Sequence, residues 1–221
     1  MNLSDSLTIY SQGRHMSKAG FLMLVALLST TLVSTLHPVH AAPTSSTTAP
    51  SVSAAPLQFA GQTFVHRWSK DNQNEFTPPE QTDLSAWHEM VTINVYPSVH
   101  DGEQLAQLSN AVLANYQQAG KIVRVNSIPA TATKPAEHLI VAILGAPGVL
   151  ETVFARAMLV DGTGIFIVYS RRSYDNAENS QNAALETGQW LQAHGEATEK
   201  QLMSWSGYPT ITTLKALPQS L

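Results

Sequence analysis

Cysteine is absent from this chain of 221 residues. Its absence excludes disulfide bonds, a thiol nucleophile, and the lipid-bearing cysteine by which lipoproteins are anchored to a membrane. A domain built from this sequence must therefore be stabilised by its own hydrophobic core.

Charged residues are scarce, at 13% of the sequence, and 12 lysines and arginines stand against 16 aspartates and glutamates. Nucleic acids and anionic lipid surfaces both attract basic proteins. This balance predicts that the protein has no nucleic-acid partner, and it argues against binding to an anionic membrane surface.

One apolar run without any charge extends from residue 19 to residue 36, and Arg14 and Lys18 precede it. A basic start, an apolar middle and an exit of small residues are typical of a secretory signal peptide. We therefore predict a signal peptide over residues 1–41. The alternative is a retained membrane anchor, for which the run is marginally long enough but is diluted by serine and threonine.

The exit of the run places the cleavage site at Ala41 or Ala42. Cleavage after Ala41 leaves small residues at the recognition positions, whereas cleavage after Ala42 would place a proline beside the cut. Either Met1 or Met16 can serve as the start, because the stretch from Met16 alone has the length of an ordinary signal peptide. After cleavage we expect no stable insertion into a membrane.

Composition divides the remaining chain into three parts. Residues 42–57 consist almost entirely of serine, threonine, alanine and proline, which predicts a flexible linker. Residues 58–205 carry the hydrophobic patterning of a single domain. Residues 206–221 predict an irregular tail, with Ile211 and Leu214 as its possible anchors.

The clearest local pattern is a strand, a helix and a second strand in succession. Residues 90–96 alternate between polar and apolar, which predicts a half-buried strand. Asp101 is placed to cap a helix, with Gln104 three residues later. Gly120 is expected to end the helix in the left-handed conformation, and residues 122–125 are expected to form the next strand. The helix would bury an apolar stripe formed by Leu105, Leu108, Val112, Tyr116 and Ala119.

The other elements are predicted by apolar runs and by turn residues between them. We expect a first strand at 59–68, a loop at 70–83, a central strand at 138–144 and a hairpin within 150–169 around Asp161-Gly162-Thr163-Gly164. A helix is expected at 183–193, closed by His194-Gly195, with Gly188 at its contact with the sheet. Residues 196–205 are expected to form a further helix or to continue this one. This order predicts an α+β domain with a mainly antiparallel, twisted β-sheet and helices packed on its faces.

No motif of catalysis is present. The sequence has no serine in a nucleophile elbow, no pair of histidines at metal-binding spacing and no phosphate-binding loop. We therefore predict no catalytic residue, no metal site and no cofactor, although a site assembled in space from His66, His88, His138 and Glu89 stays open as an alternative.

The only concentrated polar cluster lies at the end of the predicted hairpin. Arg171 and Tyr169 lie there, with Arg156 on the preceding strand, and they are candidate ligand-binding residues for an anion or a carboxylate. Arg172 must point to the opposite face from Arg171. The alternative is a solvated strand end.

The four tryptophans of the sequence are Trp68, Trp87, Trp190 and Trp205. They could line a groove for sugars or peptides, but burial between the sheet and the helices explains them more simply.

Three segments together carry a resemblance to a known family. They are HLIVAIL at 138–144, LETVFARAMLVDGTGIFIVYSRR at 150–172 and the helix ALETGQWLQAHG at 184–195. Their order resembles that of the PsbP-like α/β/α sandwich, and most of all that of its exported bacterial members, over about residues 58–195. The resemblance implies a non-catalytic accessory or binding role outside the cytoplasm, and it transfers no site residues.

These observations favour an exported, periplasmic accessory or binding protein that acts in the cell envelope, with an envelope protein as its partner. Two alternatives stay open: an envelope hydrolase with a site of histidine and carboxylate assembled in space, and a factor secreted to the medium that acts on a host or competitor cell. The sequence leaves the oligomeric state undetermined.

Overall fold

The computed structural model describes residues 55–176 and 179–220. The predicted signal peptide, its cleavage site at Ala41 or Ala42, and all but the last three residues of the predicted linker lie outside these ranges.

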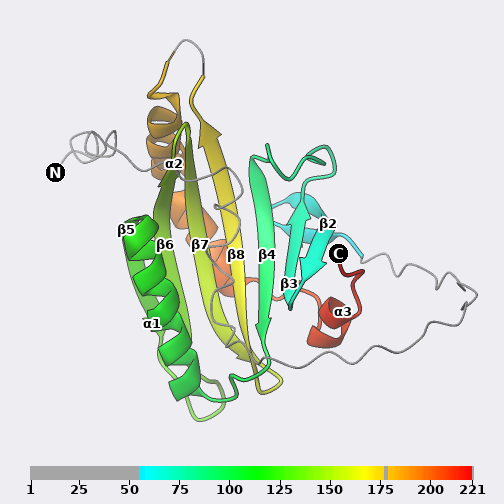
Figure 1. Cartoon of the computed structure of the whole chain (residues 1–221). Coiled ribbons are helices and arrows are strands. Elements are labelled where there is room, and N and C mark those ends of the chain that lie inside the picture. The colour runs from blue at the N-terminus through cyan, green and yellow to red at the C-terminus, as the bar shows by residue number, and fades with distance from the viewer. Residues whose placement is uncertain (1–54, 177–178, 221) are drawn as a thin grey trace, which may run out of the picture.

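Eight strands form one sheet in which every neighbouring pair is antiparallel (Figure 1), and the strand order is β1-β2-β3-β4-β8-β7-β6-β5. This confirms the α+β class with an antiparallel sheet. The strands are β1 Leu57–Phe59, β2 Gln62–Lys70, β3 Gln73–Thr77, β4 Glu89–Tyr96, β5 Gly120–Ile128, β6 Glu137–Ala146, β7 Val149–Val160 and β8 Thr163–Tyr174.

Helices cover the two faces of the sheet unequally. Helix α1, Gly102–Ala119, packs across β5, β6 and β7 on one face, whereas α2, Asn182–Ser204, packs on β7 and β8 on the other (Figure 1). Each face of the sheet has a hydrophobic core of its own. One contains Leu105 and Tyr116 of α1, and the other contains Phe154 of β7 and Leu202 of α2. Among the described residues no helix has both the length and the apolar character needed to cross a membrane.

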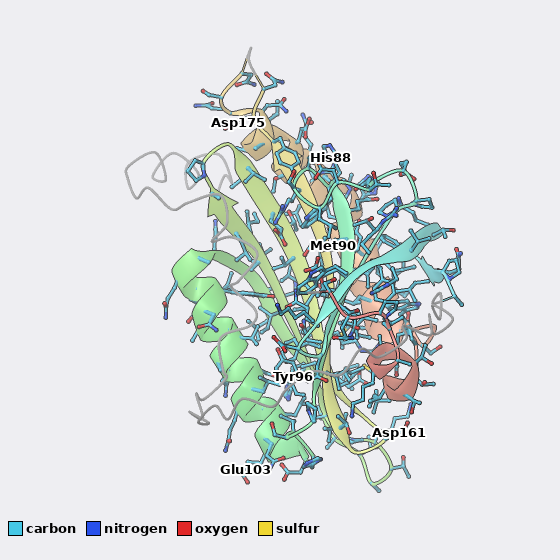
Figure 2. All side chains as sticks on the ribbon, turned by 45° about the vertical axis from the view of Figure 1, so that its right-hand side comes forward. His88, Met90, Tyr96, Glu103, Asp161 and Asp175 are labelled. Atoms are coloured by element: carbon cyan, nitrogen blue, oxygen red, sulfur yellow. The ribbon has the colours of Figure 1, made fainter. Side chains whose placement is uncertain are left out.

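The predicted strand–helix–strand unit is confirmed as β4, α1 and β5. Asp101 accepts a hydrogen bond from the backbone N–H of Gln104, and the Gln104 side chain accepts one from the N–H of His100, so the helix has a reciprocal cap. Figure 2 shows Tyr96 and Glu103 at the end of the sheet that also carries Asp161.

Two details of this unit differ from the prediction. Thr92 and Asn94 are buried as well as their apolar neighbours, so β4 is covered on both faces and not half-buried. Gly120 has an extended backbone, with φ −178°, and not a left-handed one. A side chain is excluded there by close approach instead, because a Cβ atom on Gly120 would lie 2.0 Å from the carbonyl oxygen of Ile143.

The N-terminal part of the sheet contains more strands than the sequence predicts. The expected first strand at 59–68 is a hairpin of β1 and β2, and the expected loop at 70–83 contains β3. Both turns are made by two residues with positive φ, namely Ala60-Gly61 and Asp71-Asn72. The second turn contains no glycine, so the usual sequence signal for a tight hairpin is missing.

The C-terminal part also differs from the prediction. Helix α2 continues through Gly195 to Ser204, which confirms the alternative that residues 196–205 continue the helix, whereas Gly195 does not close it and Gly188 contacts nothing that requires a glycine. The tail is not wholly irregular, because it forms the short helix α3, Ile211–Lys215, through which Leu214 reaches the core as expected.

Candidate functional site

Arg156 on β7 is 6% exposed, and its side chain connects the sheet to the end of α2. Its Nη2 lies 2.7 Å from Oε2 of Glu137, and its Nη1 donates to the backbone carbonyls of Leu202 and Trp205 at 2.9 and 2.8 Å. Both carbonyls lie at the C-terminal end of α2, where backbone acceptors lack the usual helical N–H four residues later; that of Leu202 also accepts a bond from the N–H of Trp205 at 3.2 Å. The donors of Arg156 are therefore engaged within the protein.

Arg171 and Tyr169 lie together on the α2 side of β8. The guanidinium of Arg171 is 5.4 Å from the ring centroid of Trp190, and its Nη1 donates to Oγ of Ser173 at 2.9 Å. The hydroxyl of Tyr169 donates to Oε1 of Glu89 at 2.9 Å, and burial is the main cause that raises the pKa of Tyr169.

The structure holds Arg156 apart from Arg171. Arg156 contacts α2 at Leu202, whereas Arg171 contacts it at Trp190. At the rise of an α-helix these two points are roughly 18 Å apart. The arginines of the proposed anion site of Arg156, Arg171 and Tyr169 therefore lack a shared centre, and Tyr169 lies on the sheet between them, opposite Phe154.

Arg172 faces away from Arg171, as expected from the alternation of the strand. Its guanidinium lies 3.9 Å from the ring centroid of Trp87, and its Nε donates to Oε2 of Glu151 at 2.9 Å. Both charges of this pair are largely buried. The pair forms part of a polar layer on the α1 side of the sheet.

Glu75 on β3 belongs to the same layer and is only 3% exposed. Its Oε1 accepts a hydrogen bond from Nε2 of Gln73 at 2.7 Å. Burial raises the pKa of Glu75, and the opposing effects of the Gln73 hydrogen bond and of the Arg172 charge are smaller. Sequence analysis missed this carboxylate because β3 was predicted to be a loop.

We expect that the substitution Glu75→Gln raises the free energy of unfolding by about 1 kcal/mol at pH 7, because it removes a buried charge and keeps the acceptor for Gln73. The folded-state pKa of Glu75 lies above its unfolded value, so folding favours the protonated form. The wild type should therefore lose stability relative to the variant as the pH rises above about 4.5, the ordinary pKa of glutamate. Urea unfolding at pH 4 and pH 7 measures this difference.

The matched control is Glu80→Gln, which changes an exposed carboxylate in the loop after β3 and should leave stability nearly unchanged. A Glu75→Gln protein less stable than the wild type at pH 7 would show that the carboxylate is stabilising.

Among the described residues, two histidines lie within hydrogen-bond distance of a serine, and neither pair has the partners of a catalytic triad. Nε2 of His66 lies 2.7 Å from Oγ of Ser69, which is buried and donates to Asn74. Nδ1 of His138 lies 2.9 Å from Oγ of Ser127, and among the described residues its Nε2 has no hydrogen-bond partner. A carboxylate that orients the imidazole is thus missing at His138.

The residues suggested for a spatially assembled site are not brought together. His66 and His138 contact different serines on different strands, and the ring of His88 packs against Tyr174. Glu89 accepts its hydrogen bond from Tyr169. Within residues 55–176 and 179–220 no group of three histidines or acids could hold a metal ion.

The sheet has β1 at one edge and β5 at the other, and the edge formed by β5 is the candidate binding surface. Three of the large hydrophobic side chains that are exposed in the described chain lie on this strand: Val123, Val125 and Ile128, with Val125 52% exposed. The N–H of Ser127 donates to Oδ1 of its neighbour Asn126 at 2.8 Å. Because β5 has a neighbouring strand on one side alone, every second N–H and C=O group along it has no partner in the sheet.

A protein-family model matches the chain over residues 52–200, which is more than half of its length. Among curated proteins none matches the chain significantly.

Solved structures that resemble the chain include the Ran-binding protein Mog1p of Saccharomyces cerevisiae, with 13% identity and a TM-score of 0.42, over 68% of this chain and 88% of that one. Another is PA94 from Pseudomonas aeruginosa, a protein of unknown function and putative regulator, with 12% identity and a TM-score of 0.39, over 71% and 98%. A likeness at this level carries no argument about function.

These neighbours correct the resemblance to the PsbP-like sandwich, since they are Mog1 and PA94 and not PsbP proteins. The assignment to that family is wrong. It depends on the order of strands and helices, and many antiparallel sheets covered by helices share such an order.

Proposed function

The chain belongs to the family whose model covers most of its folded part, and on that premise we propose that it is an exported, non-catalytic accessory protein. In this proposal it acts in the cell envelope by binding a protein partner. The basic and apolar pattern of residues 1–41 supports export, and the exposed edge of β5 supports a binding role.

The apolar edge of β5 is the observation that carries the proposal. An edge strand with outward N–H and C=O groups can accept a further strand from another protein. A bulge between Ile122 and Arg124 interrupts the pairing with β6, but the strand is regular beyond it. The binding surface therefore consists of residues 123–128.

The charges beside this edge indicate what kind of strand it accepts. Lys121 and Arg124 are both exposed, and β5 carries no acidic residue, so the edge is positive although Arg124 also pairs with Glu199 of α2 at 3.1 Å. A second copy of the chain would bring the same positive charges together, which is unfavourable. An extended segment with alternate apolar residues and an acidic residue is the complementary partner.

The substitution Val125→Lys should abolish partner binding, because it puts a third positive charge at the centre of the surface. The measurement is affinity capture from envelope extract, in which the partner is identified with the wild type and then compared between variants. The control is Leu185→Lys, since Leu185 on α2 is equally exposed and apolar but lies outside the edge. We expect at least a tenfold loss with Val125→Lys and none with Leu185→Lys.

Equal capture by both variants would exclude β5 as the binding surface. If the purified protein had an enzymatic activity that was lost on changing a single polar residue, this would contradict the non-catalytic role and favour an envelope hydrolase. Fractionation of producing cells tests the location, because recovery from the medium instead of the periplasm would favour a secreted factor.

A further inference from the structure

A hollow of about 350 Å³ lies between the β1–β2 turn and the end of α2. This volume is at the lower end of the range of small-molecule sites, which is roughly 300–1,000 Å³. The hollow is open to solvent on one side and is distant in sequence from the β5 edge. Its lining residues are Phe59, Ala60, Gly61, Gln201, Ser204, Trp205, Ser206 and Gly207.

Trp205 is the only tryptophan of the lining and is held in place from two sides. Its ring centroid is 5.1 Å from that of Phe59, and its carbonyl accepts a hydrogen bond from buried Arg156 at 2.8 Å. The hydrogen bond from Arg156 therefore helps to fix the position of Trp205. A ring fixed before a ligand arrives loses little conformational freedom on binding.

Gly207 leaves one edge of the Trp205 ring uncovered. A Cβ atom on Gly207 would lie 2.9 Å from Nε1 of Trp205, closer than side chains normally approach. Within the described chain Nε1 has no hydrogen-bond acceptor, although it can only donate. The indole N–H is thus free to bond to a ligand in the hollow.

The other polar groups of the lining are neutral. The side chains of Gln201 and Ser206 are exposed and make no hydrogen bond with described residues, and no charged side chain lines the hollow. A phosphate or carboxylate would find no cation there. A purely apolar ligand would leave the indole N–H and the amide without partners.

We propose that this hollow binds a neutral sugar unit of a glycan. A sugar ring offers hydroxyl groups to the indole N–H, the Gln201 amide and the Ser206 hydroxyl. Its C–H groups are attracted to an aromatic ring, whose face is negative. The open, shallow shape predicts weak binding, in the micromolar to millimolar range, as for one contact among several along a polymer.

The test is a titration of the purified protein with the neutral trisaccharides chitotriose and maltotriose, followed by NMR of the indole N–H groups. The signal of Trp205 is assigned by its loss in Trp205→Phe. We expect at least one probe to shift this signal in a saturable way. Gly207→Ala should weaken the binding at least tenfold, because the added methyl group covers the N–H or displaces the ring.

The matched control is Gly188→Ala, another glycine-to-alanine change, at a position of α2 where an added Cβ meets nothing. It should bind the trisaccharide as the wild type does. The proposal is overturned if neither trisaccharide shifts the Trp205 signal up to its solubility limit, or if Gly207→Ala binds equally well. It is also overturned if neutral triglycine amide binds more tightly than the sugars, since the hollow would then be a peptide site.

Discussion

Replacing Arg156 by alanine is expected to lower the free energy of unfolding by about 3–5 kcal/mol, the range for breaking a buried ion pair. The substitution leaves the carboxylate of Glu137 without its partner. It also removes the donor of the hydrogen bonds to the carbonyls of Leu202 and Trp205 at the end of α2. Urea unfolding followed by tryptophan fluorescence measures the change.

Arg124→Ala is the matched control, because Arg124 also forms an ion pair with a glutamate, Glu199, across the same face of the sheet. The side chain of Arg124 is 57% exposed, so water competes for both charges and the loss should stay below about 1 kcal/mol. If the Arg156 variant lost no more than this control, α2 would be docked by its apolar side chains alone.

The second large effect is expected for Gly120→Ala, which should destabilise the protein by about 3 kcal/mol or more. The added Cβ would lie 2.0 Å from the carbonyl oxygen of Ile143 and 2.8 Å from Cα of Leu144, both of which are backbone atoms. Neither can rotate away, so β5 must separate from β6 or the end of α1 must move. Thermal unfolding and urea unfolding both report the loss.

Gly102→Ala provides the comparison at the other end of α1. A Cβ atom there meets nothing within 4 Å, so we expect no loss of stability and a small gain from the better helix propensity of alanine. If Gly120→Ala were equally harmless, the junction of α1 and β5 would be able to open without cost.

The parts of the fold that local chemistry encodes were predicted from the sequence. The cap at Asp101 and the turn at Asp161-Gly162 depend on neighbours a few residues away, and the structure has both. Strand β3 could not be found in this way, since its sequence QNEFT is largely polar and its residues are buried only because β2 and β4 lie beside it.

The candidate functional surfaces also depend on contacts between residues far apart in the sequence, which local patterns do not indicate. Arg156 was predicted to help Arg171 bind an anion from across the hairpin, but Glu137 and the end of α2 occupy its donors. Val125 was correctly placed in a strand, yet only the pairing order makes that strand an edge. The hollow at Trp205 combines residues about 140 positions apart in the chain, so no local pattern could indicate it.

The strand order also has a consequence for the kinetics of folding. Strands β1 to β4 pair with their immediate successors, and so do β5 to β8, which makes each half a meander that can form through short loops. Only the pairing of β4 with β8 joins the halves, and it places Met90 opposite Ser170. We therefore expect the slow step of folding to be the meeting of two preformed halves, with β4–β8 contacts formed last.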